Sequence, residues 1–507
     1  MNSPFSDFLV GNPGRVPSSQ EAISINEILA QAAAQLVLLN SRMPRRTSGR
    51  KPPRKLRTEI DLARRFIKFH KALLAPWRLL PAEIMSEIFV FVLHPVDVDS
   101  GPTAWNDSRA QTLLLTKVCR RWRNIALSTP SLWTTLSLLL NNSPAPYEWV
   151  PLWLDRARSL PIHLQVLWHG ATSASALQSL LSTVADRIQH IRTLLINGLD
   201  GTIQIIPDHL YPKPIFPQIH SDTVKAPLLV TFEASLPLGS DYDWVFAACR
   251  GAPLLTRLYT NSFFPNRFPV TQLTTLHVIE PIPIDDIFRL LKDVAGLVEL
   301  GVDVSGPSAV TFSNGGIVVA KALCKLEITS SQWGHLADIF AQVALPSLTD
   351  LVISLIKYWP EDESVLASFL SRSSCMLQRL VFLDVDMTVT QMIRYLEHKA
   401  CNTLEWVAIS EYAYILDHLI EYLTYRQPPF PHPQLKTIEL ALDGGTPGLL
   451  ANLAESRILP ISGLPEGTTE PGSLTQLHIT TAYLETNEYA RLHALQNKCE
   501  ILVVPPP

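Results

Sequence analysis

The residue types that carry out catalysis or hold metals are present but scattered along the chain. The 14 histidines and 46 acidic residues show none of the spacings of known catalytic or metal sites, and G-x-S-x-G, G-x-x-x-x-G-K and G-x-G-x-x-G motifs do not occur. The six cysteines form no Cys-x-x-Cys pair and are expected to be reduced thiols: Cys119, Cys249, Cys324, Cys375, Cys401 and Cys499. We therefore expect a protein that is not an enzyme and that uses neither cofactor nor metal.

The composition favours a chain that is mostly folded. Of 507 residues 47% are apolar and 17% charged, so a large core can form and more than one structural unit is expected. A net charge of -4 gives no overall attraction to nucleic acid. No uninterrupted apolar run approaches the ~20 residues of a membrane span, and the first thirty residues lack the pattern of a secretory signal. We expect no membrane or nucleic-acid partner, and a location in the cytoplasm, the nucleus or both.

The chemistry that the sequence does offer is apolar contact, concentrated in residues 79 to 93, "LLPAEIMSEIFVFVL". Pro81 suits the start of a helix and Glu83 suits its first turn, whereas "IFVFVL" alone would also fit a buried strand. As a helix from 81 to 93, the segment has apolar residues over more than the ~100° that a surface helix needs, so it must be covered on two sides. The apolar residues of this helix are Ile84, Met85, Ile88, Phe89, Phe91, Val92 and Leu93.

A second amphipathic helix is predicted after the loop that ends at Asp107. Ser108 and Gln111 have the spacing of a capping box, and Leu114, Val118, Trp122 and Ile125 continue the apolar side until Pro130 stops the helix. The loop itself contains "DVDSG", which we interpret as solvated because the other ligands of a calcium loop are missing. Residues 77 to 138 are too few to bury this much apolar surface alone, which indicates a partner site.

The paired motifs "LLPAEIMSEIF" and "LTKVCRRWRNIALSTPSLW" resemble the F-box. This resemblance implies a substrate receptor of an SCF-type cullin-RING ubiquitin ligase, in which the F-box binds a Skp-family adaptor, and through it a cullin scaffold, while the rest of the chain captures a target protein. A scaffold that acts outside any ligase is the alternative. The positions matching the F-box core and adaptor face are Leu80, Pro81, Ile84, Ile88, Phe89, Val118, Cys119 and Trp122; Trp122 is assigned to the core.

The parts before the F-box are predicted as follows. Residues 1–20 are expected to be disordered, and 21–76 to form a helical arm with helices over 21–40 and about 58–74, interrupted by a basic linker at 41–57. The linker, "RRTSGRKPPRKLR", is interpreted as solvated, with a nuclear-import or phosphate-binding patch as the alternative.

Residues 150–505 contain a repeated L-x-x-L-x-L pattern. Eight copies start at Leu273, Leu297, Leu323, Leu348, Leu377, Leu404, Leu435 and Leu474, with fainter copies at Ile191, Leu229 and Leu255. Successive starts are 24 to 31 residues apart until the last step of 39, and helix-like segments lie between them. The predicted fold class is therefore α/β: an N-terminal helical F-box at 77–138 and then an irregular leucine-rich-repeat solenoid with one strand and one helix per repeat. An ordinary α/β domain is the alternative.

Within each repeat the residues beside the inward leucines should line the open face of the sheet. That row has mixed charge, which suits a protein or peptide better than a polyphosphate. The substrate-binding candidates are Lys325, Glu327, Arg379 and Trp406, with Trp406 as the strongest because aromatic residues dominate interface hot spots. A partly buried packing role for Trp406 is equally open.

Overall fold

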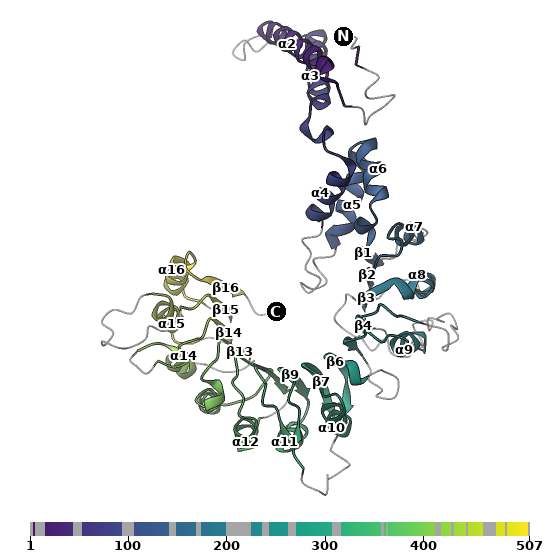
Figure 1. The fold of residues 1–507 in the computed structure, drawn as a ribbon. Helices are drawn as coiled ribbons and strands as arrows, with labels where there is room; N and C mark the ends of the chain where they lie inside the picture. Colours follow the sequence, from purple (N-terminus) through teal and green to yellow (C-terminus); the bar gives the residue numbers. More distant parts are fainter. Residues whose placement is uncertain are drawn as a thin grey trace. The chain divides into compact units, whose positions relative to one another are not determined.

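The computed structural model (Figure 1) divides into two compact units, Met1–Thr183 and Val184–Pro507. It describes residues 4–5, 16–43, 53–93, 106–140, 149–168, 174–198, 225–235, 243–261, 270–306, 316–355, 359–360, 364–410, 417–426, 430–442, 445–459, 473–481 and 484–504. The "DVDSG" loop and most of the basic linker lie outside these residues.

The first unit begins with a helical hairpin of α2 (Ser19–Ser41) and α3 (Arg54–Leu73). Ser18 and Glu21 form a capping box that starts α2: the Glu21 N–H donates to Ser18 Oγ at 3.3 Å and the Ser18 N–H donates to Glu21 Oε2 at 2.8 Å. The two helices meet through two buried clusters, one of Phe5, Ile25 and Leu73 and one of Leu39, Ile60 and Ala63. The predicted helical arm at 21–76 therefore packs on itself.

Two details of this arm differ from the prediction. Phe5, which we expected in a disordered segment, is buried in the hairpin. The helix α3 begins at Arg54 and not near Thr58, so the end of the basic linker is helical. Pro53 explains this start, because its fixed φ is close to the helical value and its missing N–H is not needed there.

The helix α2 also bears on the expectation that the chain avoids membranes. Among the described helices, α2 passes the length and composition test for a membrane span, with a mean hydropathy of 1.5. Signal sequences and core helices of soluble proteins pass the same test, so a single such helix is weak support for a span. The absence of a membrane partner remains a prediction.

The rest of the first unit is helical with a short parallel strand pair. In chain order it consists of η2 (Pro76–Arg78), α4 (Ala82–Leu93), α5 (Asn106–Val118), α6 (Arg120–Ser128), η4 (Pro130–Trp133), β1 (Thr135–Leu140), α7 (Trp149–Arg156), β2 (Ile162–Trp168) and α8 (Ala174–Arg187). The unit boundary falls inside α8, after Thr183. Strands β1 and β2 pair in parallel from Thr135 opposite His163.

The second unit is a large parallel sheet with a helix after most strands. Its strands are β3 (Ile191–Gly198), β4 (Thr231–Ser235), β5 (Arg257–Thr260), β6 (Thr275–Pro283), β7 (Glu299–Ser305), β9 (Lys325–Ser330), β11 (Asp350–Leu355), β12 (Arg379–Leu383), β13 (Trp406–Ser410), β14 (Thr437–Leu442), β15 (Gln476–Thr481) and β16 (Glu500–Val504). All eight repeat copies and the three fainter ones become strands of this sheet, which confirms that part of the prediction.

The helices lie along one side of this sheet in Figure 1. They are α9 (Asp243–Arg250), α10 (Ile284–Asp293), α11 (Trp333–Gln342), α12 (Ser364–Ser373), α13 (Val389–Leu396), α14 (Asp417–Leu423), α15 (Leu449–Ile458) and α16 (Thr486–Leu495), with η5 (Ile188–His190), η7 (Val270–Gln272) and η8 (Lys399–Cys401) in the connections. A separate pair of short strands, β8 (Val318–Val319) and β10 (Val343–Ala344), lies outside the main sheet. Because parallel strands need a crossover, each helix returns the chain to the same end of the sheet.

The same backbone contacts recur from strand to strand. The Thr274 carbonyl accepts the N–H groups of Val298 and Glu299 at 2.8 and 3.0 Å, and the Val298 carbonyl accepts those of Cys324 and Lys325 at the same distances. The leucine that opens each copy is fully buried, as Leu323 and Leu348 illustrate. The period in the sequence thus arises because one buried leucine and one shared carbonyl set the start of each strand.

Candidate functional site

The apolar helix that the sequence singled out, α4, buries only one of its sides within the chain. Met85, Phe89 and Leu93 recur every four residues and are buried. The exposed fractions of Ile84, Ile88, Phe91 and Val92 are 49%, 40%, 84% and 60%. We expected this helix to be covered on two sides. Its own chain covers one side, and the other side is open to a partner.

The segment that leads into α4 is held in place by backbone contacts. The Pro81 carbonyl accepts the Met85 N–H at 3.1 Å, which places Pro81 directly before the helix. Arg121 donates from Nη1 to the Arg78 carbonyl at 2.7 Å and from Nη2 to the Leu80 carbonyl. Burial lowers the pKa of the Arg78 guanidinium from its usual value. This clamp fixes the start of α4 on α6, so the outward side of α4 has a defined direction.

The predicted second helix is in fact two helices, α5 and α6, broken at Cys119. Cys119 has an extended backbone, with φ -158°, and its Sγ accepts the Trp122 N–H at 3.5 Å as the cap of α6. The break changes the direction in which the apolar positions face. Val118 is 57% exposed on α5, whereas Ile125 on α6 is buried. The continuous apolar stripe that we predicted from Leu114 to Ile125 is therefore wrong, and the side chain of Ser108 lies outside the described part.

The predicted adaptor-binding residues separate into core and surface. Phe89 is buried, and the Trp122 ring packs against the rings of Phe89 and Trp77 with centroids 4.8 and 5.9 Å apart. Leu80, Cys119 and Trp122 are half-buried, while Pro81, Ile84, Ile88 and Val118 are exposed. Leu79 and Leu114 are also exposed, and neither was among the predicted adaptor-binding residues. The uninterrupted apolar run from Ile88 to Leu93 was the one signal that could have identified Phe91 and Val92 as surface residues, and Leu79 lies outside it.

The second surface is the open face of the parallel sheet. One register row aligns Thr275, Glu299, Lys325, Asp350, Arg379, Trp406, Thr437, Gln476 and Glu500, and the row two residues on aligns Glu233, Tyr259, His277, Gly301, Glu327, Val352, Val381, Ala408, Glu439, His478 and Leu502. These rows contain all four predicted substrate-binding residues. Residues that are 18 to 39 positions apart in the sequence thus become neighbours.

The charged residues at one end of these rows pair with one another. His277 Nε2 lies 3.1 Å from Glu299 Oε1, the same carboxylate binds Lys325 Nζ, and the His277 ring stacks on Tyr259 with centroids 4.8 Å apart. The hydrogen bond from His277, aided by Lys325, lowers the pKa of Glu299 to about 2. Lys325 therefore forms its ion pair with Glu299 and none with Glu327.

Gly301 makes this arrangement possible, because its Cβ would overlap the His277 imidazole, with Cγ at 2.9 Å. We expect Gly301→Ala to displace the ring, remove its contact with Glu299 and raise the pKa of Glu299 from about 2 toward the ordinary value of 4.5. Because the pKa of Glu299 is lower in the folded state, its ionised carboxylate stabilises the fold above about pH 4.5. This stabilisation disappears as the pH falls toward 2, and the variant should lose part of it at neutral pH. NMR titration of the carboxylate measures the change.

Gly296→Ala is the matched control, since nothing lies within 4 Å of the Cβ added there. An unchanged Glu299 titration in the Gly301→Ala protein would contradict the role of the glycine.

At the centre of the open face the charges give way to an apolar patch. Val352, Val381 and Ala408 are buried there, with Leu383 and Trp406 packed on them; these five residues are called the apolar patch below. The Arg379 guanidinium lies 4.6 Å from the centroid of the Trp406 ring. The structure thus brings Arg379 and Trp406 together, and Trp406 has both a packing role and a half-exposed surface.

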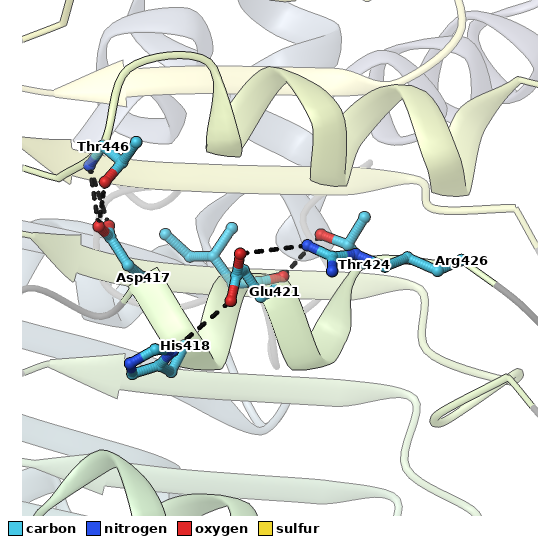
Figure 2. Close-up of polar contacts among 7 residues, drawn as sticks. Asp417, His418, Glu421, Thr424, Arg426 and Thr446 are labelled. Atoms are coloured by element: carbon cyan, nitrogen blue, oxygen red, sulfur yellow. Dashed lines mark hydrogen bonds and ion pairs between the residues drawn. The ribbon is translucent and has the colours of Figure 1, made fainter.

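A further group of acidic and histidine side chains lies on α14, on the helical side of the sheet (Figure 2). Glu421 contacts His418 Nδ1 at 3.5 Å and Arg426 Nη2 at 3.2 Å, and Asp417 accepts the Thr446 N–H at 3.0 Å. The His418 side chain is 85% exposed, so these contacts tie a helix to the chain around Thr446 at the surface without forming an enclosed site. No group of three or more metal-ligating residues occurs in the part of the chain that the structure describes.

The comparison with known proteins bears on the first surface. Residues 77–139 match the F-box-like family. The chain therefore contains an F-box-like domain, with nearly the boundaries predicted from the paired motifs. No curated protein matches the chain at a significant level. The exposed side of α4 and the clamp formed by Arg121 both lie inside the F-box-like domain.

Proposed function

We propose that this protein is the substrate receptor of an SCF-type ubiquitin ligase and has no catalytic chemistry of its own. In this role the F-box-like domain binds a Skp-family adaptor that connects it to a cullin. The supporting observation is the set of exposed apolar side chains on α4 and α5 within that domain: Ile84, Ile88, Phe91, Val92, Leu114 and Val118. Clustered exposed apolar side chains of this kind favour a protein partner.

We further propose that the second unit is an irregular leucine-rich-repeat solenoid whose open face binds the target protein. Its regular parallel register and the leucine at each strand start support this reading. The substrate-binding residues proposed there are Arg379 and Trp406 at the apolar patch, together with Lys325 and Glu327. The six free cysteines agree with a location in the cytoplasm or nucleus.

The proposal is tested by substituting Ile84, which is exposed and so tolerates a polar replacement in the isolated chain. We expect Ile84→Asp to weaken binding to a purified Skp-family adaptor by about 100-fold or more, because an unpaired carboxylate would be buried in the interface. Calorimetry or a pull-down with the full chain measures this.

Leu152→Asp is the matched control, since Leu152 is similarly exposed in the same unit but lies outside the F-box-like domain. Binding retained by a folded Ile84→Asp protein, or absent from the unaltered chain, would argue against the receptor function. An adaptor complex that recruits no cullin would instead favour a scaffold outside the ligase.

A further inference from the structure

The apolar patch on the open face has a buried part and a half-buried part. Its half-buried members, Leu383 on β12 and Trp406 on β13, rest on the buried Val352, Val381 and Ala408. They leave a supported apolar surface on the open face, since their own lower sides are already packed. Interface hot spots have this character: an aromatic side chain held rigidly by neighbours that exclude water.

The cations near the apolar patch are already engaged by the chain itself. Lys325 Nζ binds Glu299, and the Arg379 guanidinium stacks on Trp406. On the far side, Glu439 Oε1 lies 3.2 Å from His478 Nδ1. The Trp406 ring does not neutralise Arg379, which lies directly beside Asp350 in the same row. Glu327, Asp350 and Arg379 together therefore leave one negative charge, on the side of β9 and β11.

Two carboxylates supply that charge, Glu327 on β9 and Asp350 on β11, called the acidic pair below. Both side chains are half-buried in the rows of the open face. Within the described residues neither takes part in an ion pair, and Asp350 Oδ2 accepts only the neutral hydroxyl of Thr349 at 2.7 Å. A cation from outside the chain would complete the pairing at this position.

The register determines how far the acidic pair lies from the apolar patch. Asp350 and Trp406 occupy the same row two strands apart, and Glu327 and Val381 do so in the next row. With strands about 4.8 Å apart, each separation is about 10 Å. An extended peptide advances about 3.3 Å per residue, so about three residues span this distance.

From this geometry we propose that the open face binds an extended segment of the target protein in which a lysine or arginine lies three residues from a bulky apolar side chain. The cation pairs with Glu327 and Asp350, and the apolar side chain packs on Leu383 and Trp406. This inference rests on the proposed function and specifies the class of target. A phosphorylated epitope is disfavoured at this position, because its charge would face the acidic pair.

The test is selection of a random dodecapeptide display library on the purified full-length chain. We expect enrichment of peptides with Lys or Arg three positions from Leu, Ile, Met, Phe or Trp. A synthetic peptide of the enriched sequence should bind at least about 10-fold more weakly to the Glu327→Gln/Asp350→Asn double variant, because it loses a charge-assisted contact. The Glu327→Lys/Asp350→Lys variant should select acidic peptides instead.

Glu421→Gln on α14 is the matched control, because it removes an exposed carboxylate from the helical side of the sheet (Figure 2) and should leave peptide affinity unchanged. Three results would overturn the inference: no enriched peptide, enrichment without a cation at this spacing, or equal affinity for the double variant. Adaptor binding is measured on the same proteins. If the adaptor binds and the peptide pattern fails, only this inference falls; if the peptides bind and the adaptor does not, the receptor function falls.

Discussion

Replacing Arg457 with methionine should destabilise the region around α14 and α15 by about 3 kcal/mol. The side chain is 3% exposed, and its guanidinium donates to the carbonyls of Leu423 at 2.7 Å, Pro431 at 3.0 Å and His432 at 3.3 Å. Methionine fills a similar volume but donates no hydrogen bond, so three buried or half-buried carbonyls would lose their partner. Removing the buried charge also removes its desolvation cost, but that cost is small because the three carbonyls solvate the guanidinium. The free energy lost with the hydrogen bonds is therefore the larger of the two.

The electrostatics of this cluster agree with a structural role. Burial lowers the pKa of Arg457 to about 10 and that of His432 to about 4, so the neighbouring histidine is neutral at physiological pH. His432 Nδ1 contacts the Cys401 carbonyl at 3.1 Å, and the Tyr425 ring lies 4.0 Å from the guanidinium. Arg457 thus links segments that are 25 to 34 residues apart in the sequence.

Hydrogen exchange of the full chain, followed by mass spectrometry, measures the effect locally. Amides of α14 and α15 in the Arg457→Met protein should exchange about 100-fold faster, as a loss of about 3 kcal/mol implies. Arg426→Met is the control, because Arg426 is 65% exposed and makes a surface ion pair with Glu421. Protection that is unchanged in both variants would show that the buried guanidinium is not needed for stability.

The second large effect is expected for Trp133→Ala in the first unit, with a loss of about 3 to 5 kcal/mol. The Trp133 side chain is fully buried, and its Nε1 donates to the Ala126 carbonyl at 2.8 Å. Its ring meets Trp153 with centroids 4.6 Å apart, and the Arg156 guanidinium lies 4.5 Å from its centroid. Alanine would leave a large cavity between the F-box-like domain and α7, together with an unpaired carbonyl.

Trp133→Phe separates the two contributions, since it keeps a ring against Trp153 and loses only the indole hydrogen bond, at a cost of about 1 to 2 kcal/mol. Leu152→Ala on the same helix as Trp153 should change little, because Leu152 is 58% exposed. Thermal unfolding followed by near-ultraviolet circular dichroism reports on the tryptophans. A Trp133→Ala protein as stable as the Leu152→Ala protein would contradict this account.

The sequence by itself determined where the strands and most helices begin. Leu323 and Leu348 each precede a strand by two residues, and the same offset holds for the other strong copies, because a buried leucine followed by alternation is a local pattern. The F-box-like domain was likewise recognised from two short motifs, and its boundaries agree with the family match. Local spacing carries this information since the periods of helices and strands depend on neighbours a few residues away.

The tertiary structure alone decided which residues face out and which residues pair. The break at Cys119 separates Val118, which is exposed, from Trp122, which packs between two rings, although both belong to one predicted stripe. Lys325 binds Glu299 and leaves Glu327 without an ion pair, because the register of β7 and β9 places Lys325 directly beside Glu299. Such outcomes depend on distances across strands and helices, which a local pattern does not contain; the partner chosen by each charge is therefore set only when the sheet assembles.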